Sequence, residues 1–421
     1  MRLEGNIAGG ITALVNLYKN IRDFLGRQSN NYRMMVARTA GAHFLFNLTG
    51  QYTSIYTKAL GADNFLIGLI SSFSAFISML VSMPVGYITD KYNLRKVLGA
   101  GMLLNIIMIG LYAAAKDWRW IFLAMAINPL SMALMFRSQQ VIVTNELKNR
   151  DRSTGMGLRL QMAYLLGLVS PVIGATIVNL MGGLNTSGIR PLYIIRFAGL
   201  LIIYTYIYRR VENVPPPPRE HASIGFLQDF KEVLDQGGRK LKTMIVVGAL
   251  GAFVWSTLEG FAFLYAEEVK GADAYTLGLM PTCETIAFLL FSTTMNRLAD
   301  NRGRKYAFLI VRPGLWLSFI IAILAPSPRW LLVAWFIRGI ALSTTAYETL
   351  YLELVPAEQR GRWMGLSNTF TAMVRIGAPL VGGVLYDSSM PWLIFAIPLA
   401  VDMLLRTPIL YIWVPETLIR E

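Results

Sequence analysis

Twelve apolar runs, each long enough to cross a membrane, constrain this fold more than any other feature of the sequence. A stretch of roughly 20 mostly apolar residues spans a bilayer as an α-helix. Inside the bilayer every backbone polar group must be bonded within the protein, so a chain of such runs folds as a helix bundle. The runs cover residues 34–58, 64–88, 97–115, 118–144, 154–181, 190–209, 243–267, 274–297, 305–326, 329–353, 362–386 and 391–413. We therefore expect an all-α membrane protein with twelve transmembrane helices.

Composition excludes the other broad classes. Hydrophobic residues make up 54% of the chain and charged residues only 15%, which is untypical of a soluble globular protein. One cysteine rules out a disulfide framework and a cysteine-built metal site, and two histidines leave little for any other metal centre. The net charge of +14 does not indicate nucleic-acid binding, because the basic residues punctuate the apolar runs and do not gather in one patch.

The chain also repeats itself. The matching pairs 210 residues apart are Gly61 with Gly271, Asp63 with Asp273, and Asp90 with Asp300; those 208 apart are Arg152 with Arg360, Pro171 with Pro379, and Gly174 with Gly382. A near-constant offset over more than a hundred residues indicates an internal duplication. Two pseudo-symmetric bundles of six helices are therefore expected, with a solute site between them near the midplane of the membrane.

Charge sets the expected orientation and boundaries. Lysine and arginine concentrate on the termini, on the loops near residues 91, 150, 300 and 360, and on the central linker, so both termini are predicted to be cytoplasmic in a multi-pass plasma-membrane protein. No cleavable signal peptide is visible. The expected segments are a cytoplasmic amphipathic segment (1–33, with a surface helix over 11–25), a first bundle (34–209), a cytoplasmic Pro-rich linker (210–242), a second bundle (243–413) and a cytoplasmic tail (414–421).

One charged hairpin occurs twice. In its first copy, residues 86–97, Asp90 ends one span while Lys91 and Arg95 begin the next; the second copy covers residues 296–305. The stretch resembles the loop signature G-x-x-x-D-(R/K)-x-G-(R/K)-(R/K) of the major facilitator superfamily. Asn93 replaces the inner glycine of the first copy, and Asn296 replaces the outer glycine of the second. The resemblance extends over nearly the whole chain, from about Arg33 to Pro415.

This resemblance implies a transporter that works by alternating access. Spans 1, 4, 7 and 10 would line a central cavity, spans 2, 5, 8 and 11 would form gates, and the rest would brace the outside. It also implies a charged inner gate network, for which the competing interpretation is simple anchoring to lipid headgroups. The network residues are Gly86, Asp90, Lys91, Arg95, Glu146 and Arg152 in the first half, and Asp300, Arg304, Lys305, Glu353 and Arg360 in the second.

Spans 5 and 11 carry small residues and proline at helical spacing, which permits close approach and bending. The span 5 stretch resembles the family's antiporter signature G-x-x-x-G-P-x-x-G-G, with Ser170 and Ala175 replacing two glycines. This favours antiport, although helix packing alone would explain the same residues. The gate-helix residues are Pro171, Gly174, Pro379, Gly382 and Gly383.

Ionisable residues within the spans need a reason, because each costs ~2.5–3.5 kcal/mol at the centre of a membrane helix. Glu259 is the first candidate for a proton carrier, followed by Glu348, Glu284 and His43. The alternative for the acids is a structural ion pair with Arg338 or Arg375. Asp402 and Arg406, one turn apart in the last run, are expected to pair with each other.

The first half contributes buried cations and the second most of the buried acids, which predicts an electrostatically asymmetric cavity. Arg137 offers a fork suited to a carboxylate or phosphate, or it pairs with an acid across the cavity. The polar residues of span 1 would bind a polar solute or join helices to one another. The expected cavity residues are Arg38, Asn47, Gln51, Tyr52, Tyr56, Arg137, Gln140, Trp255, Arg338 and Arg375.

These features predict a secondary transporter that works by alternating access and exports a small organic solute in exchange for protons. The alternative is a proton-coupled symporter that imports a small anionic nutrient, with Arg38 and Arg137 as ligands. An enzyme is not expected, because the chain has no nucleophile elbow and no phosphate-binding loop. The expected partners are a small-molecule substrate, protons and the lipid bilayer, with no cofactor, no metal and no nucleic acid, and we expect a monomer.

Overall fold

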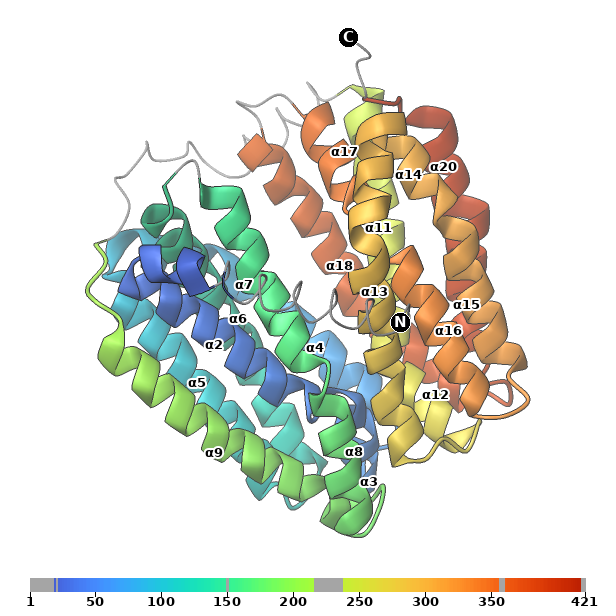
Figure 1. The fold of residues 1–421 in the computed structure, drawn as a ribbon. Helices are drawn as coiled ribbons and strands as arrows, with labels where there is room; N and C mark the ends of the chain where they lie inside the picture. Colours follow the sequence, from blue (N-terminus) through green and yellow to red (C-terminus); the bar gives the residue numbers. More distant parts are fainter. Residues whose placement is uncertain (1–18, 20–21, 149–150, 216–237, 356–359, 418–421) are drawn as a thin grey trace, which may run out of the picture.

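A computed structural model describes residues 19, 22–148, 151–215, 238–355 and 360–417. Within these residues the regular elements are all helices. Figure 1 shows them in two bundles, one coloured blue to green and the other yellow to red. The structure therefore has the all-α, two-bundle architecture that the apolar runs predict.

The N-terminal bundle holds the first six expected spans. Its elements are α2 (Asn30–Asn47), η1 (Gly50–Tyr52) and α3 (Thr53–Ala59) for span 1, α4 (Asn64–Lys91), α5 (Leu94–Ala114), α6 (Trp118–Glu146), α7 (Arg152–Gly167) with α8 (Ser170–Leu180) for span 5, and α9 (Thr186–Arg210).

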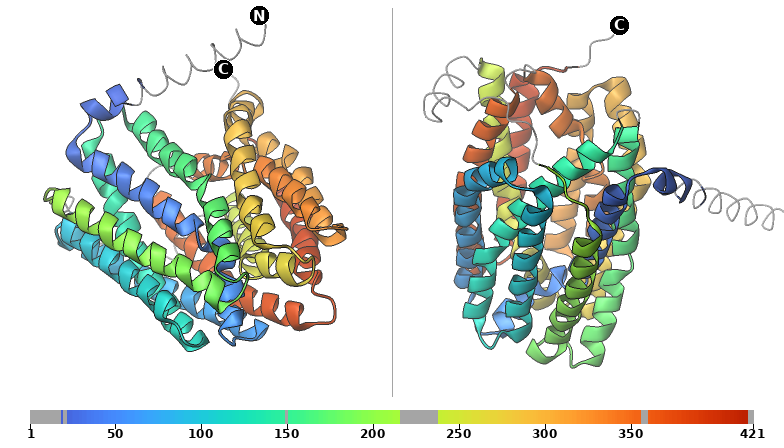
Figure 2. Two further views of the ribbon diagram at one scale, coloured as in Figure 1. Left: turned by 60° about the horizontal axis from the view of Figure 1, so that its bottom comes forward. Right: turned by 90° about the vertical axis from the view of Figure 1, so that its left-hand side faces the viewer.

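The C-terminal bundle holds the other six. Its elements are α11 (Arg239–Glu259) with α12 (Ala262–Glu268), α13 (Ala274–Arg302), α14 (Arg304–Ile310) with α15 (Arg312–Leu324), α16 (Arg329–Ala341) with α17 (Ala346–Leu354), α18 (Arg360–Asp387), and α19 (Leu393–Ala400) with the π-helix η4 (Val401–Arg406) and α20 (Thr407–Trp413). In both bundles the helices run roughly along one common direction (Figure 2).

Eleven helices of the described chain are long and apolar enough to cross a membrane. Span 1 is the expected span that is not among them. It is divided between α2, η1 and α3, and polar residues run through it. At the break the Thr49 hydroxyl bonds to the carbonyl of Phe46 and accepts a hydrogen bond from Arg196 at 2.7 Å. A buried arginine of span 6 therefore stabilises the irregular backbone at this break. The sequence of span 1 alone did not predict the break.

The sequence repeat produces the same local structure at two equivalent hairpins, one in each bundle. Gly61 and Gly271 both adopt positive φ (92° and 69°), a conformation that glycine reaches without steric cost. Asp63 and Asp273, two residues later, each cap the next helix by accepting a backbone N–H, at 2.7 and 2.8 Å. The duplicated Gly-Ala-Asp sequence thus makes the same turn in each bundle.

Parts of the expected organisation lie outside the described residues. The surface helix expected over 11–25 falls mostly there, although the chain is helical from residue 22 to residue 27. Most of the linker also lies outside the described residues, as do the last residues of the tail. Helix α9 ends at Arg210, and α11 begins at Arg239.

Candidate functional site

The two bundles meet most closely at two pseudo-symmetric helix crossings. A Cβ atom added at Gly68 of α4 would lie 2.5 Å from the carbonyl oxygen of Pro379 in α18. One added at Gly278 of α13 would lie 2.6 Å from the carbonyl oxygen of Pro171 in α8. Real Cβ atoms do not approach so closely, so only glycine allows the helices to cross at these points.

Three more of the small gate-helix residues serve close packing. Gly174 lies against the backbone of Leu48 at the break in span 1, and Gly382 lies against the backbone of Thr257 in α11. Gly383 packs across the bundles against Asn64, at the start of α4. Span 2 therefore packs against span 11, and span 5 against span 8, where the two bundles meet.

For orientation we term the face with the Asp90 and Asp300 loops the inner face and the opposite one the outer face. Among the described residues, the hydrogen bonds and ion pairs that join the bundles all lie towards the outer face. They are Tyr52 Oη to Ala274 O (3.0 Å), Asn64 Nδ2 to Asp387 Oδ1 (2.7 Å), Thr282 Oγ1 to Leu168 O (3.2 Å) and Lys58 Nζ with Glu268 Oε1 (2.6 Å). Together with the glycine crossings we term these contacts the outer gate, which is closed in this conformation.

The ion pair of the outer gate joins two equivalent positions. Lys58 ends span 1 and Glu268 ends span 7, and they are 210 residues apart, which is the offset of the repeat. The Tyr386 hydroxyl donates to the second oxygen of Glu268 at 3.0 Å. The sequence analysis missed this pair, although opposite charges at pseudo-symmetric span ends were a signal that could have found it.

We predict that Lys58→Glu weakens outer-gate closure, because it places two carboxylates together. Each side chain of the pair is 31% exposed, so after solvent screening the effect is about 1 kcal/mol, a roughly fivefold shift towards an open outer face. The measurement is the distance between spin labels on the outer loops at Lys116→Cys and Arg329→Cys, in a Cys283→Ser background. Adding Glu268→Lys should restore the wild-type distance distribution; if the swapped pair stays open, the ion pair does not hold the gate.

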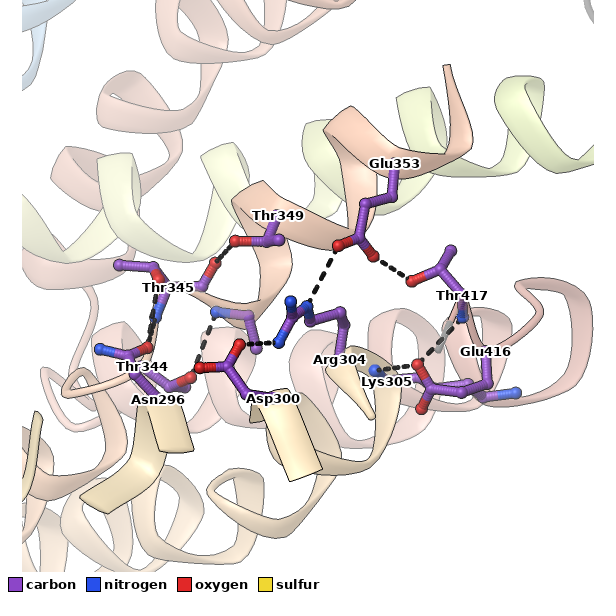
Figure 3. A network of polar contacts seen from close by, with 11 residues as sticks. Asn296, Asp300, Arg304, Lys305, Thr344, Thr345, Thr349, Glu353, Glu416 and Thr417 are labelled. Carbon is purple, nitrogen blue, oxygen red and sulfur yellow. Dashed lines mark hydrogen bonds and ion pairs between the residues drawn. The ribbon is translucent and has the colours of Figure 1, made fainter. Parts of the chain in front are cut away.

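At the inner face of the C-terminal bundle, a polar network surrounds Arg304 (Figure 3). Arg304, at the start of α14, bonds to Asp300 and, at 3.2 Å, to Glu353 at the end of α17. Asn296, at the position of the missing outer glycine, accepts hydrogen bonds from the backbone and hydroxyl of Thr345. Three residues of the expected network, together with Asn296, thus connect spans 8, 9 and 10.

The C-terminal tail adds two residues that the sequence analysis missed. The Glu416 carboxylate accepts the backbone N–H groups of Lys305 and Tyr306, at 3.2 and 3.1 Å, and so caps α14. The Thr417 hydroxyl bonds to Glu353. Gly303 has φ 117°, and a Cβ there would meet the Glu416 carboxylate at 2.2 Å. The inner glycine of the second hairpin therefore makes room for the tail.

The N-terminal bundle is arranged differently at the inner face. Glu146 accepts a hydrogen bond from Asn31 at 2.7 Å, and Arg95 stacks on Tyr208 and donates to its carbonyl. The described contacts of Lys91 are with Tyr87 and Tyr92, and Arg152 donates weakly to the carbonyl of Thr144. The expected ion pairs of this half are therefore not formed among the described residues. The side chains of Asp90 and Arg360 lie outside that part.

The outer glycine of the first hairpin has a specific neighbour. A Cβ on Gly86 would lie 2.6 Å from Nη1 of Arg137 in α6. Arg137 and Gln140, both expected in the cavity, are exposed, and Arg137 lies over the backbone of α4. Gly86 thus makes room for an arginine side chain between spans 2 and 4.

In the C-terminal bundle the structure brings together an acid, a base and aromatic rings. Glu284 of α13 pairs with Arg338 of α16 at 2.9 Å, and the two side chains are 23% and 20% exposed. The Arg338 guanidinium lies 5.5 Å from the centre of the Trp255 ring in α11. Spans 7, 8 and 10 therefore meet around one ion pair.

The other candidate acids are placed differently. Glu259, one turn beyond Trp255, is exposed, as are Glu348 and Arg375. None of these three forms an ion pair within the described chain. Of the described acids expected to carry protons, Glu284 alone is paired with one of the arginines that the alternative interpretation named. Glu259 lies on the same helix as Trp255, which contacts Arg338.

Among its described residues, the N-terminal bundle supplies buried cations and no buried acid. Arg38 of α2 is 8% exposed, contacts the Met135 sulfur at 3.6 Å and has no carboxylate partner among the described residues. Arg159 of α7 donates to the Thr39 hydroxyl at 3.3 Å, and Gln139 of α6 donates to the same oxygen at 2.6 Å. Spans 1, 4 and 5 thus enclose a positively charged polar cluster, which we term the Arg38 cluster.

Span 1 also packs on the gate helix of its own bundle. His43 and Asn47 lie against Gly167, and Asn47 donates to its carbonyl at 3.3 Å. The His43 ring is edge-on to the Tyr164 ring. The centre of the Tyr164 ring lies 5.3 Å from the centre of the Phe288 ring in the other bundle. His43 is therefore linked to the bundle interface by one aromatic contact.

Four of the expected cavity residues are buried in the protein interior: Arg38, Gln51, Tyr52 and Tyr56. Tyr56 is fully buried inside the N-terminal bundle, where its hydroxyl bonds to the carbonyl of Tyr112 and its ring stacks on Tyr193. These contacts place it away from the cavity position expected from the helical period. Gln51 is 3% exposed and immediately precedes Tyr52, whose hydroxyl forms an outer-gate hydrogen bond.

Comparison with known proteins assigns the family. The sequence profile of the Major Facilitator Superfamily matches residues 39–283 and 271–421. The chain belongs to the major facilitator superfamily. Relatives of similar sequence include "Multidrug resistance protein 2" of Bacillus subtilis (strain 168), 21% identical over 333 residues that cover 76% of this chain and 79% of the relative. Another is "Quinolone resistance protein NorA" of Staphylococcus aureus (strain COL), 21% identical over 343 residues, 79% of this chain and 84% of the relative.

Among solved structures, the nucleoside transporter NupG aligns with a TM-score of 0.71 and 15% identity, over 90% of this chain and 98% of that one. This likeness confirms the superfamily fold. The major facilitator superfamily is a family of transporters, so the chain is a membrane transporter and not an enzyme.

Proposed function

We propose that the protein exports a small organic solute by alternating access, in exchange for protons. The observation that carries this proposal is the Glu284–Arg338 ion pair, which lies within spans 8 and 10 and is partly buried. An ionised carboxylate within a membrane span is costly unless it has a partner or a function. Protonation of Glu284 removes the charge that holds Arg338, so proton binding and the state of this cluster are coupled.

The position of the pair supports a role in switching between conformations. Glu284 lies on α13, the helix that crosses Pro171 at Gly278 in the outer gate. A Cβ on Gly339, next to Arg338, would lie 2.3 Å from the carbonyl oxygen of Glu284, so α13 and α16 are in close backbone contact. A change in the charge of Glu284 therefore acts on a gate helix directly.

The available driving force is sufficient for export. One proton moving through ~100 mV releases ~2.3 kcal/mol, and one pH unit adds ~1.4 kcal/mol. Two relatives are named a multidrug resistance protein and a quinolone resistance protein, and these names support an organic solute and an outward direction. We further propose that the protein works as a monomer in the plasma membrane, with both termini in the cytoplasm.

The test uses everted membrane vesicles with a pre-formed proton gradient, monitored by a pH-sensitive dye. Under antiport, addition of a quinolone should partly collapse the gradient in vesicles that contain the protein. Vesicles without it, and vesicles given a small organic acid, serve as controls. A gradient that no tested solute disturbs would argue against proton antiport.

Two variants then separate the candidate proton carriers. Glu284→Gln is expected to abolish the pH dependence of transport while counterflow of solute continues, because exchange of solute for solute needs no proton. Glu259→Gln, at the end of α11, is the second variant that could lose the pH dependence of transport. Glu212→Gln, an exposed acid beyond the end of α9, is the control and should keep the wild-type pH dependence. If the Glu284→Gln and Glu259→Gln variants both retain proton-driven transport, neither acid is the proton carrier and the assignment is wrong.

A proton-coupled symporter for a small anion is the second candidate function. The Arg38 cluster favours it, because a buried guanidinium without a carboxylate partner is suited to an anionic ligand. In the same vesicles, symport of an organic acid would carry protons with the solute, so the gradient would respond to the acid and not to the quinolone. Arg38→Gln should then weaken binding of the acid and leave binding of a neutral solute unchanged.

A further inference from the structure

Helix α11 has one face that no other helix of the described chain covers. Gly251 of α11 lies against Arg406 of η4, and Gly248 lies against Tyr347 of α17. By the 3.6-residue period of the helix, Lys242 and Val246 lie on the opposite side, and both are exposed. Both α18 and α20 pack on α11, and the exposed side of α11 lies between them.

A groove runs along this uncovered face. It consists of two adjoining hollows of about 460 and 450 Å³ that share Lys242 and Val246. The first is lined by Arg239, Lys242 and Thr243 of α11 with Ile409 and Trp413 of α20. The second continues between α11 and α18 and is lined by Leu250, Phe253, Phe370 and Val374.

The groove changes in character along its length. Its inner-face end carries two cations, Arg239 and Lys242, and the Arg239 guanidinium lies 4.9 Å from the centre of the exposed Trp413 ring. Tryptophan and arginine in contact at a helix end are typical of the headgroup level of a bilayer. Beyond Val246 the wall is apolar as far as Phe253, which is the environment of an acyl chain.

The charge at the inner-face end is not neutralised by any carboxylate of the described residues. Within the described chain neither Arg239 nor Lys242 forms an ion pair with a carboxylate. A ligand with a phosphate and an apolar tail would therefore match both ends of the groove. A zwitterionic headgroup matches less well, because it brings a cation of its own next to two others.

We propose that this groove binds one anionic phospholipid, with its phosphate at Arg239 and Lys242 and an acyl chain along α11 from Val246 to Phe253. Such a lipid would join α11, α18 and α20 on the side of span 7 that faces away from the other bundle. Because α11 carries Trp255 and Glu259 further along, lipid binding would also steady the helix next to the Glu284–Arg338 pair. The binding proposal itself does not depend on which solute is transported.

The test uses the full-length protein in detergent, with phosphatidylglycerol as the probe and phosphatidylcholine of the same acyl chains as the comparison. Native mass spectrometry should show one phosphatidylglycerol retained more strongly than phosphatidylcholine. The same lipid should raise the thermal unfolding temperature more than phosphatidylcholine does, because a ligand that binds only the folded state stabilises it. The preference should diminish as salt is raised, because the cations are near the surface.

Three variants locate the site. Lys242→Gln and Arg239→Gln should each weaken phosphatidylglycerol binding about fivefold, which is the contribution of one interfacial cation. Ala249→Trp, within the apolar part of the groove, should reduce retention of the lipid without a change in charge. Lys240→Gln is the matched control, since Lys240 is exposed on the other side of the same helical turn and should leave binding unchanged. Circular dichroism and size-exclusion chromatography verify that every variant folds.

Two results would overturn the proposal. Equal retention of phosphatidylglycerol and phosphatidylcholine by the wild-type protein would show that the two cations select no headgroup. An equal loss in Lys240→Gln and Lys242→Gln would show that only net charge matters and that the groove is not the site. Neither result bears on proton coupling, which the vesicle experiment tests separately.

Discussion

Gly278→Ala is expected to shift the transporter about 5- to 150-fold towards an open outer face. The added methyl group would lie 2.6 Å from the carbonyl oxygen of Pro171 and 3.0 Å from the Cβ of Ala175. The nearest of these atoms belongs to the backbone of α8 and cannot rotate away, so the crossing must separate. Overpacking of this kind costs ~1–3 kcal/mol, and the cost falls only on the closed state.

The distance between spin labels on the outer loops measures this shift. Labels at Lys116→Cys and Arg329→Cys, both at exposed positions, should show a longer distance in Gly278→Ala than in the parent protein. Gly68→Ala should have the same effect through the equivalent crossing with Pro379.

The control is a glycine with space around it. No atom lies within 4 Å of a Cβ built at Gly365 of α18, so Gly365→Ala should leave the label distance unchanged. Because alanine favours a helix over glycine, this variant should be slightly stabilised, if anything. Unchanged distances in both Gly278→Ala and Gly68→Ala would show that the glycine crossings do not control the outer gate.

Asp402→Asn is expected to destabilise the folded protein by ~3–5 kcal/mol, which is the usual cost of removing one partner from a buried ion pair. Asp402 is fully buried. Its carboxylate accepts hydrogen bonds from Arg406 at 3.1 Å, Arg312 at 3.4 Å and Trp316 at 2.9 Å. The expected Asp402–Arg406 pair is thus confirmed, with a second arginine from span 9. Without the carboxylate, two guanidinium groups would remain in the core of the bundle.

Asp300→Asn is the matched comparison. Asp300 also pairs with an arginine four residues later, but its side chain is 64% exposed. An exposed pair of this kind contributes ~0–1 kcal/mol, so this variant should unfold at nearly the wild-type temperature. Thermal unfolding in detergent, followed by circular dichroism, compares the two. Similar unfolding temperatures for both variants would mean that burial of Asp402 does not determine its contribution.

Several features of the site were predictable from the sequence because their cause is local. The Gly61 and Gly271 turns and the Asp63 and Asp273 caps depend on a few adjacent residues, and the repeat exposes them twice. Contacts within the Arg304 network join ends of consecutive spans, so a family signature also predicts them.

Other features depend on distant parts of the chain, and no local pattern reports them. Glu416 caps α14 from more than a hundred residues away, and Arg196 supports the break in span 1 from span 6. Tyr56 follows that break, and its contacts with Tyr112 and Tyr193, which are far away in the sequence, place it inside the bundle. The partner of Glu284 was one of two arginines proposed from sequence, and the packing of α13 on α16 selects Arg338.

The sequence alone determined that this protein is a duplicated bundle of membrane helices, because hydropathy and the offset of the repeat are properties of the chain in any conformation. The tertiary structure alone decided which residues join the two bundles. A transporter closes one face at a time, so cross-bundle contacts such as Lys58 with Glu268 and Gly68 with Pro379 belong to one conformation of the molecule and not to its sequence.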